Sequence, residues 1–147
     1  MSPCTIASVR TVESLSELIG ETPMLRLGPL EPGGAAQVWA KLEAYNPGFS
    51  VKDRVGLALV DRAEAAGLPP GGTIVEATAG NTGLALALVG RRRGYRVVLF
   101  VPKRFSSEKQ RLMAALGAEV VATPSDDGMA GAQRRARELA ESEPGAV

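Results

Sequence analysis

The sequence predicts an α/β fold, a parallel sheet covered by helices on both faces. From residue 50 onward, segments with helical spacing of apolar residues alternate with short apolar segments, in the order helix, strand, helix, strand, helix, strand, helix. Only a few residues connect successive segments, and this alternation is typical of a parallel sheet whose crossover connections are helices. The length of 147 residues is enough for one domain with a real core.

Composition and charge restrict the class of protein. Hydrophobic residues make up 45% and charged residues 22% of the chain, near the average for globular proteins. The 17 basic and 16 acidic residues leave a net charge of +1, which gives no electrostatic footprint for a nucleic acid or an anionic membrane. No run approaches about 18 apolar residues, and the first residues lack the charged-then-apolar pattern of a signal sequence. We therefore expect no nucleic-acid or membrane partner and a cytoplasmic location.

The chain lacks histidine and has a single cysteine, Cys4. These counts exclude Ser-His-Asp and Cys-His nucleophile systems, Cys/His zinc sites and an internal disulfide, and we expect no metal site. Any chemistry must therefore use Lys, Asp, Glu, Ser, Thr or Tyr, or a bound cofactor.

The first 45 residues predict a short helix followed by a hairpin. Apolar residues recur at helical spacing over residues 11–19, and Gly20 is placed to end the helix. Residues 24–27 and 37–43 have the pattern of strands. The segment 28–34 between them is rich in Gly and Pro, so the two strands are expected to pair.

The first helix of the α/β part is expected to follow a turn at Pro47 and Gly48. Ser50 and Asp53 fit a capping box in which Ser50 is the N-cap of a helix that continues to about Gly67.

Lys52 then lies in the first turn of this helix, where the positive end of the helix dipole disfavours a cation by about 0.3–1 kcal/mol. The neutral amine is favoured instead, and a lysine that attacks a carbonyl carbon near neutral pH needs such an environment. Arg54 is a candidate for a neighbouring cation that adds to this effect. The alternative is that Lys52 is an ordinary surface lysine beside a helix start.

The rest of the chain supplies the remaining strands and helices. The cluster Arg91, Arg92 and Arg93 lies at the end of a helix, where it complements the negative end of the dipole; a phosphate-binding patch is the alternative. The predicted elements are a strand at 73–77, a buried helix that includes 84–89 and ends at Gly94, a strand at 96–101, a helix at 107–116, a strand at 118–122, and a helix capped by Asp126 or Asp127 that ends near Ser142.

The loop after the strand at 73–77 is a candidate ligand site. Ligands of open α/β sheets bind beyond the carboxyl ends of the strands, where free N–H groups at a helix N-terminus bind anions. In residues 78–83, glycines allow close approach of the backbone, Thr78 and Thr82 offer hydroxyls, and Asn81 offers an amide. The loop lacks the GxGxxG and GK[ST] patterns of nucleotide-binding folds, and a plain connection is the alternative.

Four segments together resemble one known family. Residues 19–27, 46–54, 76–83 and 102–119 look like the matching segments, in the same order, of the cysteine synthase (O-acetylserine sulfhydrylase) family, close relatives of cystathionine β-synthase. The resemblance implies a pyridoxal-phosphate enzyme of fold type II that makes L-cysteine from O-acetyl-L-serine and sulfide. It also implies a homodimer for the full-length enzyme. Cystathionine β-synthase or another fold type II lyase is the nearest alternative activity.

By this resemblance, Lys52 corresponds to the catalytic lysine that holds pyridoxal phosphate, and Asn81 to the asparagine that hydrogen-bonds the cofactor's O3′. Many members of the family have Ser at position 79, so Ala79 puts the substrate preference within the family in question. The substrate carboxylate would be bound by the loop of Thr78, Ala79, Gly80, Asn81 and Thr82.

The resemblance also predicts how the chain is divided. Residues 46–147 would form the N-terminal α/β domain, and residues 1–45, with the helix and hairpin, would pack on a larger domain. Members of the family are about twice this length, and the segments that bind the cofactor phosphate and face its pyridine nitrogen would lie beyond Val147. We therefore expect a partial sequence of an intact enzyme, with a short homologue or a non-catalytic binding protein as alternatives.

Overall fold

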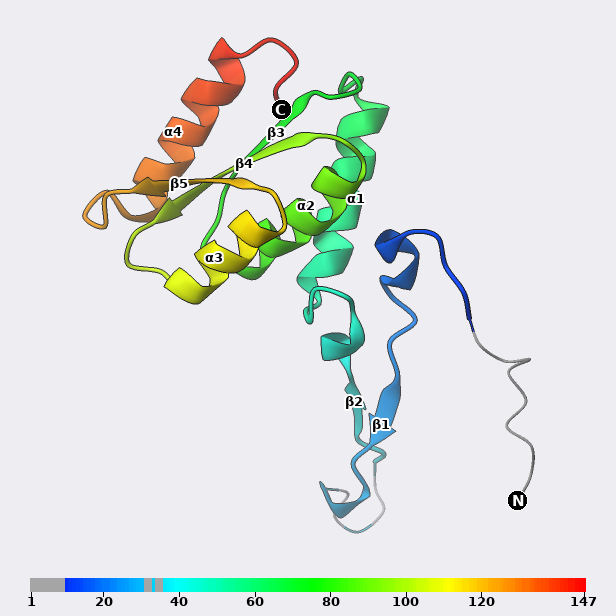
Figure 1. Ribbon diagram of the computed structural model, residues 1–147. Coiled ribbons are helices and arrows are strands. Elements are labelled where there is room, and N and C mark those ends of the chain that lie inside the picture. Colours follow the sequence, from blue (N-terminus) through cyan, green and yellow to red (C-terminus); the bar gives the residue numbers. More distant parts are fainter. Residues whose placement is uncertain (1–9, 31–32, 34–35) are drawn as a thin grey trace.

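The computed structural model describes residues 10–30, 33 and 36–147, which form an α/β body and a projecting hairpin (Figure 1). Cys4 and part of the predicted hairpin connection lie outside these residues. Val98 of the central strand of the body pairs with Val75 on one side and with Glu119 on the other. The predicted parallel sheet is confirmed, with its strands in the order β3 (Thr73–Ala77), β4 (Arg96–Pro102) and β5 (Glu119–Thr123).

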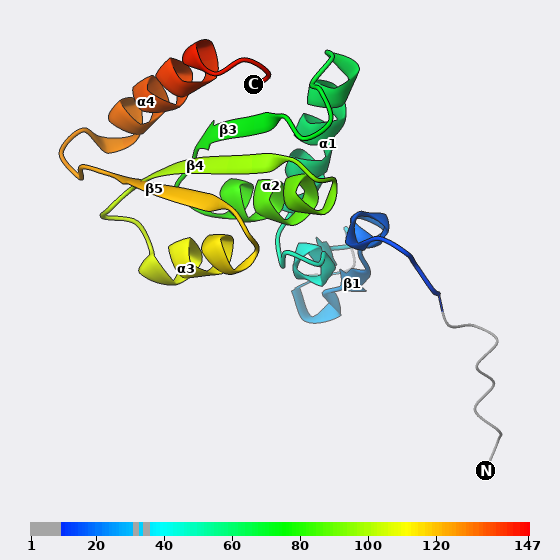
Figure 2. The ribbon, with the colours of Figure 1, turned by 45° about the horizontal axis from the view of Figure 1, so that its top comes forward.

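Helices cover both faces of this sheet, as predicted (Figure 2). On one face lies α4 (Gly128–Ser142), and on the other lie α2 (Asn81–Arg92) and α3 (Ser107–Ala115). Side chains alternate along a strand, so the central strand β4 contributes to the cores on both faces. The core beneath α2 contains Val97, Leu99 and Val101, whereas the core beneath α4 contains Val98 and Phe100.

The helix α1 (Lys52–Ala65) packs along α2, and the two helices approach closely at Gly56. A Cβ atom on Gly56 would lie 2.6 Å from the Cβ of Ala85, a distance that real side chains do not reach. A glycine inside a helix costs about 1 kcal/mol relative to alanine, and close packing is the reason for one here. This crossing fixes the start of α1 relative to α2.

The N-terminal hairpin is confirmed, and it is shorter than predicted. β1 (Met24–Arg26) and β2 (Trp39–Lys41) pair in antiparallel fashion. Hydrogen bonds from Leu27 N to Val38 O and from Leu42 N to Pro23 O continue the pairing at both ends. The hairpin projects from the body, so several of its apolar side chains are exposed.

The helix predicted at residues 11–19 is confirmed only in part, as a shorter 3₁₀ helix. Only one 3₁₀ turn forms, Leu15–Leu18. Ser14 and Glu17 form a capping box that fixes the start of this turn, and Ile19 is already extended. Because Gly20 follows directly with a φ of 96°, there is no room for a second turn.

The elements of the body lie close to their predicted positions. At α4, Asp127 precedes the helix as expected for an N-cap, but its side chain makes no capping hydrogen bond. The Asp127 carboxylate lies 3.9 Å from Arg135 instead. Within the described part of the chain, no helix combines the length and apolar character needed to cross a membrane.

Residues 145–147 extend the sheet on the free side of β3. Thr73 N donates to Gly145 O at 3.0 Å, and Val75 N donates to Val147 O at 2.8 Å. Since β4 and β5 lie on the other side of β3, the strand order reverses here. Ligands of open α/β sheets bind beyond the carboxyl ends of the strands at such a reversal, and the loop after Ala77 occupies that position.

Candidate active site

A tight turn places Lys52 at the start of α1. Phe49 has a left-handed backbone conformation, with a φ of 59°, shortly before the helix. The Ser50 hydroxyl accepts a hydrogen bond from Lys52 N at 3.1 Å, but Val51 is the N-cap of α1, so the prediction that Ser50 is the N-cap is wrong. The predicted capping box does not form either, because the buried Asp53 carboxylate turns back and accepts from Gly48 N. Burial raises the pKa of the Asp53 carboxyl group.

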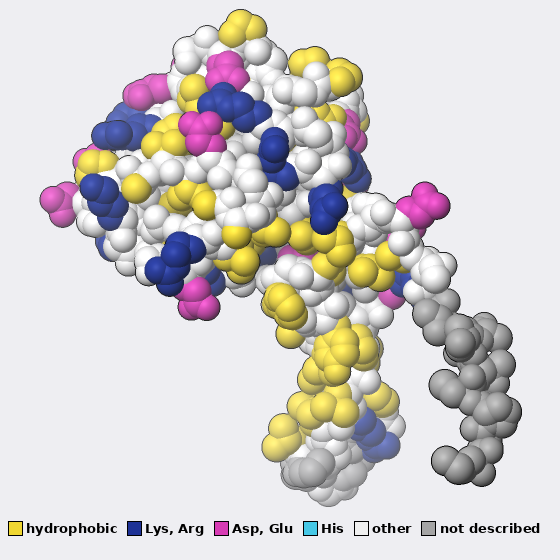
Figure 3. Space-filling view, in the orientation of Figure 1, with side chains coloured by type: hydrophobic (Ala, Val, Ile, Leu, Met, Phe, Trp, Pro, Cys, Tyr) yellow, Lys and Arg dark blue, Asp and Glu magenta, His cyan; other side chains and the backbone are white. Residues whose placement is uncertain are grey.

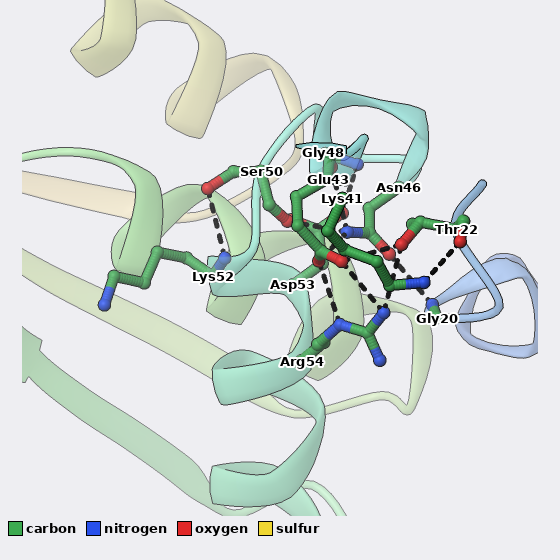
Figure 4. A network of polar contacts seen from close by, with 10 residues as sticks. All are labelled: Gly20, Thr22, Lys41, Glu43, Asn46, Gly48, Ser50, Lys52, Asp53 and Arg54. Carbon is green, nitrogen blue, oxygen red and sulfur yellow. Dashed lines mark hydrogen bonds and ion pairs between the residues drawn. The ribbon is translucent and has the colours of Figure 1, made fainter. Parts of the chain in front are cut away.

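Arg54 belongs to a polar network that lies on the opposite side of α1 from the Lys52 side chain (Figure 4). Its Nε and Nη2 atoms donate to the two carboxylate oxygens of Glu43, at 2.9 and 3.0 Å. The hydrogen bond from Arg54 is the chief cause that lowers the pKa of Glu43 to about 2, and a hydrogen bond from Thr22 adds to it. The prediction that Arg54 is the cation beside Lys52 is therefore wrong.

Asn46 connects this network to the turn before α1. Its side chain is buried, with 1% exposed. Its Oδ1 accepts from Gly20 N at 2.8 Å, and its Nδ2 donates to Ser50 O at 3.1 Å and to Glu43 Oε2 at 2.9 Å. The base of the hairpin, the turn and the first turn of α1 therefore form one hydrogen-bonded unit that holds the backbone of Lys52.

The Lys52 side chain extends away from the network (Figure 4) and lines a cavity of about 410 Å³. Among the described residues its amine has no hydrogen-bond partner. The cavity brings together all the residues predicted for the site: Lys52, Thr78, Ala79, Gly80, Asn81 and Thr82. Ser50, Val51 and Lys109 complete its lining.

The loop between β3 and α2 supplies one wall of this cavity. Thr78 is buried, and its Oγ1 accepts from Gly80 N at 3.2 Å and from Gly83 N at 3.1 Å. The hydroxyl of Thr78 therefore braces the loop, and its contact with a substrate stays a prediction. Within the described residues, the N–H groups of Asn81 and Thr82 have no acceptor, so the N-terminus of α2 retains free donors for an anion.

Lys109 is a residue of the cavity that the sequence analysis did not single out. It lies in the first turn of α3, and its Nζ donates to Oδ1 of Asn81 at 2.8 Å. Asn81 Nδ2 in turn donates to the Ser50 hydroxyl at 3.2 Å. The signal in the sequence was the same as for Lys52, since a helix dipole disfavours a cation in the first turn. Among the described residues that line the cavity none is acidic, so the two lysines and the N-terminus of α2 make it electropositive.

Two residues of the arginine cluster, Arg91 and Arg92, lie in the last turn of α2, where the first interpretation placed the cluster. Arg91 donates to the backbone oxygen of Tyr95 at 2.7 Å. Arg93 pairs with Asp61 at 2.6 Å and with Glu64 at 2.8 Å. The residues that the structure describes contain no cluster of acidic, His or Cys side chains suited to a metal ion.

Comparison with known proteins decides the family. A family model described as pyridoxal-phosphate dependent enzyme matches residues 15–147, which include the whole cavity. The chain belongs to this family of pyridoxal-phosphate-dependent enzymes. The resemblance in the sequence is therefore confirmed, and pyridoxal phosphate is the cofactor of the family.

Individual relatives narrow the comparison. The chain is 48% identical over 129 residues to an O-acetylserine dependent cystathionine β-synthase of Bacillus subtilis, and the match covers 87% of this chain and 42% of that protein. It is 45% identical over 133 residues to a cysteine synthase of Staphylococcus aureus, covering 90% and 43%. A cysteine synthase structure from Entamoeba histolytica superposes with a TM-score of 0.86 at 37% identity, covering 100% and 44%. The chain thus spans less than half the length of these relatives.

The groups that line the cavity fit pyridoxal phosphate. An aldehyde carbon needs a primary amine that is not already paired, and Lys52 supplies one. The oxygen anions of the cofactor or of a substrate need donors, which the N-terminus of α2 and the Asn81 amide supply. Lys52 would hold the aldehyde carbon and Asn81 the phenolic oxygen.

Proposed function

We propose that the protein to which this chain belongs catalyses a β-replacement that forms L-cysteine and acetate from O-acetyl-L-serine and sulfide. The observation that carries the proposal is that the Lys52 amine, which has no partner among the described residues, and the loop at 78–82 line one cavity in a member of this cofactor family. The names of the relatives support the same substrate class, because they include cysteine synthases and an enzyme that depends on O-acetylserine.

The loop would orient the substrate. Free N–H groups at the start of α2 would hold the substrate carboxylate, with the positive end of the helix dipole behind them. Ala79 contributes no hydroxyl to this interaction, so the carboxylate would be bound chiefly by backbone donors. This anchoring would place the substrate Cα within reach of Lys52, because both groups face one cavity.

Lys52 would serve as the base. When bound, the cofactor supplies an electron sink for the pair left behind when Cα loses its proton. The amino group of the substrate would first replace Lys52 at the aldehyde carbon, which frees the Lys52 amine to remove one proton from Cα. Over one turnover, acetate leaves Cβ, sulfide takes its place, and Lys52 returns that proton. The crossing at Gly56 and the network around Glu43 would keep this amine in position.

The nearest alternative is cystathionine β-synthesis, in which homocysteine replaces sulfide. It is favoured by the 48% identity to an enzyme of that name. The full-length protein, supplied with pyridoxal phosphate and O-acetylserine, should release cysteine when sulfide is added. Product formed only with homocysteine would establish the alternative, and absence of both cofactor absorbance and product would favour a non-catalytic binding protein.

We also infer the assembly and location of the full-length protein. Residues 1–45 would pack on a larger domain, which is supported by the exposed apolar side chains along the hairpin (Figure 3). A homodimer in the cytoplasm, acting on small molecules, completes the proposal. Sedimentation of the purified full-length protein would test the dimer.

A further inference from the structure

We propose that Lys109 is a positioning residue that fixes the Asn81 amide so that its nitrogen, and not its oxygen, is presented to the cofactor. The proposal rests on the proposed function, because it takes the cofactor as the group that Asn81 meets. Lys109 comes from α3, which contributes no other residue to the cavity. No step of the proposed reaction uses Lys109.

The geometry forms a chain of hydrogen bonds along one wall of the cavity. Lys109 Nζ donates to Asn81 Oδ1 at 2.8 Å, Asn81 Nδ2 donates to Ser50 Oγ at 3.2 Å, and Ser50 Oγ accepts from Lys52 N at 3.1 Å. The chain connects the first turns of α3, α2 and α1. Asn81 Nδ2 carries two hydrogens and uses one of them for Ser50, so one donor is left for a ligand.

The chemistry of lysine makes this arrangement directional. An ammonium group has three donors and no acceptor, so Lys109 can bind only the oxygen of the Asn81 amide. An asparagine without such a partner can turn over and present its oxygen, which would face the phenolic oxygen of the cofactor unfavourably. Lys109 therefore selects one of two orientations that differ little in shape.

Two local features indicate that the contact is built into the fold. Lys109 lies in the first turn of α3, where the helix dipole disfavours a cation, so its position needs a compensating partner. Gly80 leaves room for the side chain, since a Cβ at that position would lie 3.1 Å from Lys109 Nζ and 3.2 Å from its Cδ. Ser106 Oγ caps Lys109 N at 3.3 Å and so holds the start of α3.

The test measures cofactor affinity in the full-length protein after the bound cofactor has been removed. Pyridoxal phosphate and an analogue that lacks its 3-hydroxyl group are titrated against each variant, with absorbance as the readout. The analogue has no phenolic oxygen, so it cannot report the Asn81 contact. Circular dichroism of each variant checks the fold.

We expect Lys109→Met to lower the affinity for pyridoxal phosphate about tenfold, the scale of one hydrogen bond to a charged group. The affinity for the analogue should change by less than about twofold. Lys109→Arg keeps a donor-only cation and should restore most of the affinity. Asn81→Ala should give a loss like that of Lys109→Met, and the double variant should be no worse than either. Lys103→Met is the matched control, because Lys103 is exposed and outside the cavity.

Three results would overturn the inference. Equal losses of affinity for the cofactor and the analogue in Lys109→Met would mean that Lys109 acts on the ligand directly, through its charge. Additive effects of Lys109→Met and Asn81→Ala would mean that the two residues act separately. If Lys109→Met leaves the affinity for pyridoxal phosphate unchanged while Asn81→Ala lowers it, Lys109 does not position Asn81. These results leave the proposed function standing, whereas a wild-type protein that does not bind pyridoxal phosphate would refute the proposed function itself.

Discussion

Phe49 lies three residues before Lys52 in the left-handed region of backbone space, with a φ of 59°. A residue with a Cβ pays about 1–2 kcal/mol for this conformation, whereas glycine adopts it freely. The side chain is 78% exposed, so its removal loses little packing. We expect Phe49→Gly to raise the free energy of unfolding by about 0.5–1 kcal/mol, after the entropy that glycine adds to the unfolded chain is subtracted.

Chemical denaturation would measure this change, and Phe49→Ala is the control because alanine keeps the Cβ atom. An equal gain in both variants would show that the phenyl ring, and not the backbone, was the source. A loss of stability in Phe49→Gly would contradict the strain argument.

At the residue scale, the sequence predicted which side chains meet but not how they are held. Lys52 and Asn81 each lie at the start of a helix, and the prediction that they share one site came from the resemblance to a known family. Lys109 also lies in the first turn of a helix, but its contact with Asn81 could not be predicted, since it depends on the orientation of a helix 28 residues further along the chain. Arg54 was predicted to adjoin Lys52 from sequence proximity, but residues two positions apart on a helix face different sides.

At the scale of the elements, the crossing of α1 and α2 sets the distance between Lys52 and the loop. We expect Gly56→Ala to lower the free energy of unfolding by about 1–3 kcal/mol, because the new methyl group would overlap Ala85. Thermal or chemical unfolding would measure the loss. Gly28→Ala is the matched control, since a Cβ at that position meets nothing within 4 Å. An unchanged stability for Gly56→Ala would show that the helices can separate freely.

The network that anchors the hairpin to α1 predicts a dependence of stability on pH. The pKa of Glu43 is lowered from 4.5 to about 2, so its charged form stabilises the fold above pH 4.5, and this contribution is lost as the pH falls from 4.5 toward 2. Glu43→Gln should therefore be less stable than the wild type at pH 6, and the difference should shrink toward pH 2. Urea denaturation at a series of pH values would measure it, with Glu138→Gln as an exposed control. A difference that does not vary with pH would contradict the role of the Glu43 charge.

The elements of the body were predictable because their periodicity is strong and Gly or Pro marks their ends. β3, for example, has the predicted bounds, because Gly72 precedes it and the Thr78 loop follows. The difference at residues 11–19 has a local cause. Apolar spacing suggested two turns, but the Ser14–Glu17 capping box starts the helix only at Leu15, and the extended Ile19 and the left-handed Gly20 end it after one.

At the scale of the whole molecule, the hairpin exposes apolar side chains that a stable monomer would cover. Met24, Leu25 and Trp39 are 57%, 51% and 47% exposed. The chain covers less than half the length of its relatives, so we expect residues 1–147 produced alone to bind pyridoxal phosphate weakly and to make no cysteine. We also expect them to self-associate, because exposed apolar edges of a hairpin pair readily. Sedimentation velocity over a range of concentrations would show association, and it should fall in the Leu25→Thr, Trp39→Thr double variant. Leu112→Thr, an exposed leucine on α3, should leave it unchanged. A monomer at every concentration would contradict this expectation.

The central claim is that Lys52 is the residue that binds the cofactor. The cavity also contains the amine of Lys109, so the test must show which of the two lysines reacts with the cofactor. The full-length protein would be loaded with pyridoxal phosphate, reduced with borohydride and digested, and the modified peptide would be identified by mass spectrometry. We predict a pyridoxyl group on Lys52 and none in a Lys52→Ala variant. A label on Lys41, Lys103 or Lys109 in the wild-type protein would contradict the assignment.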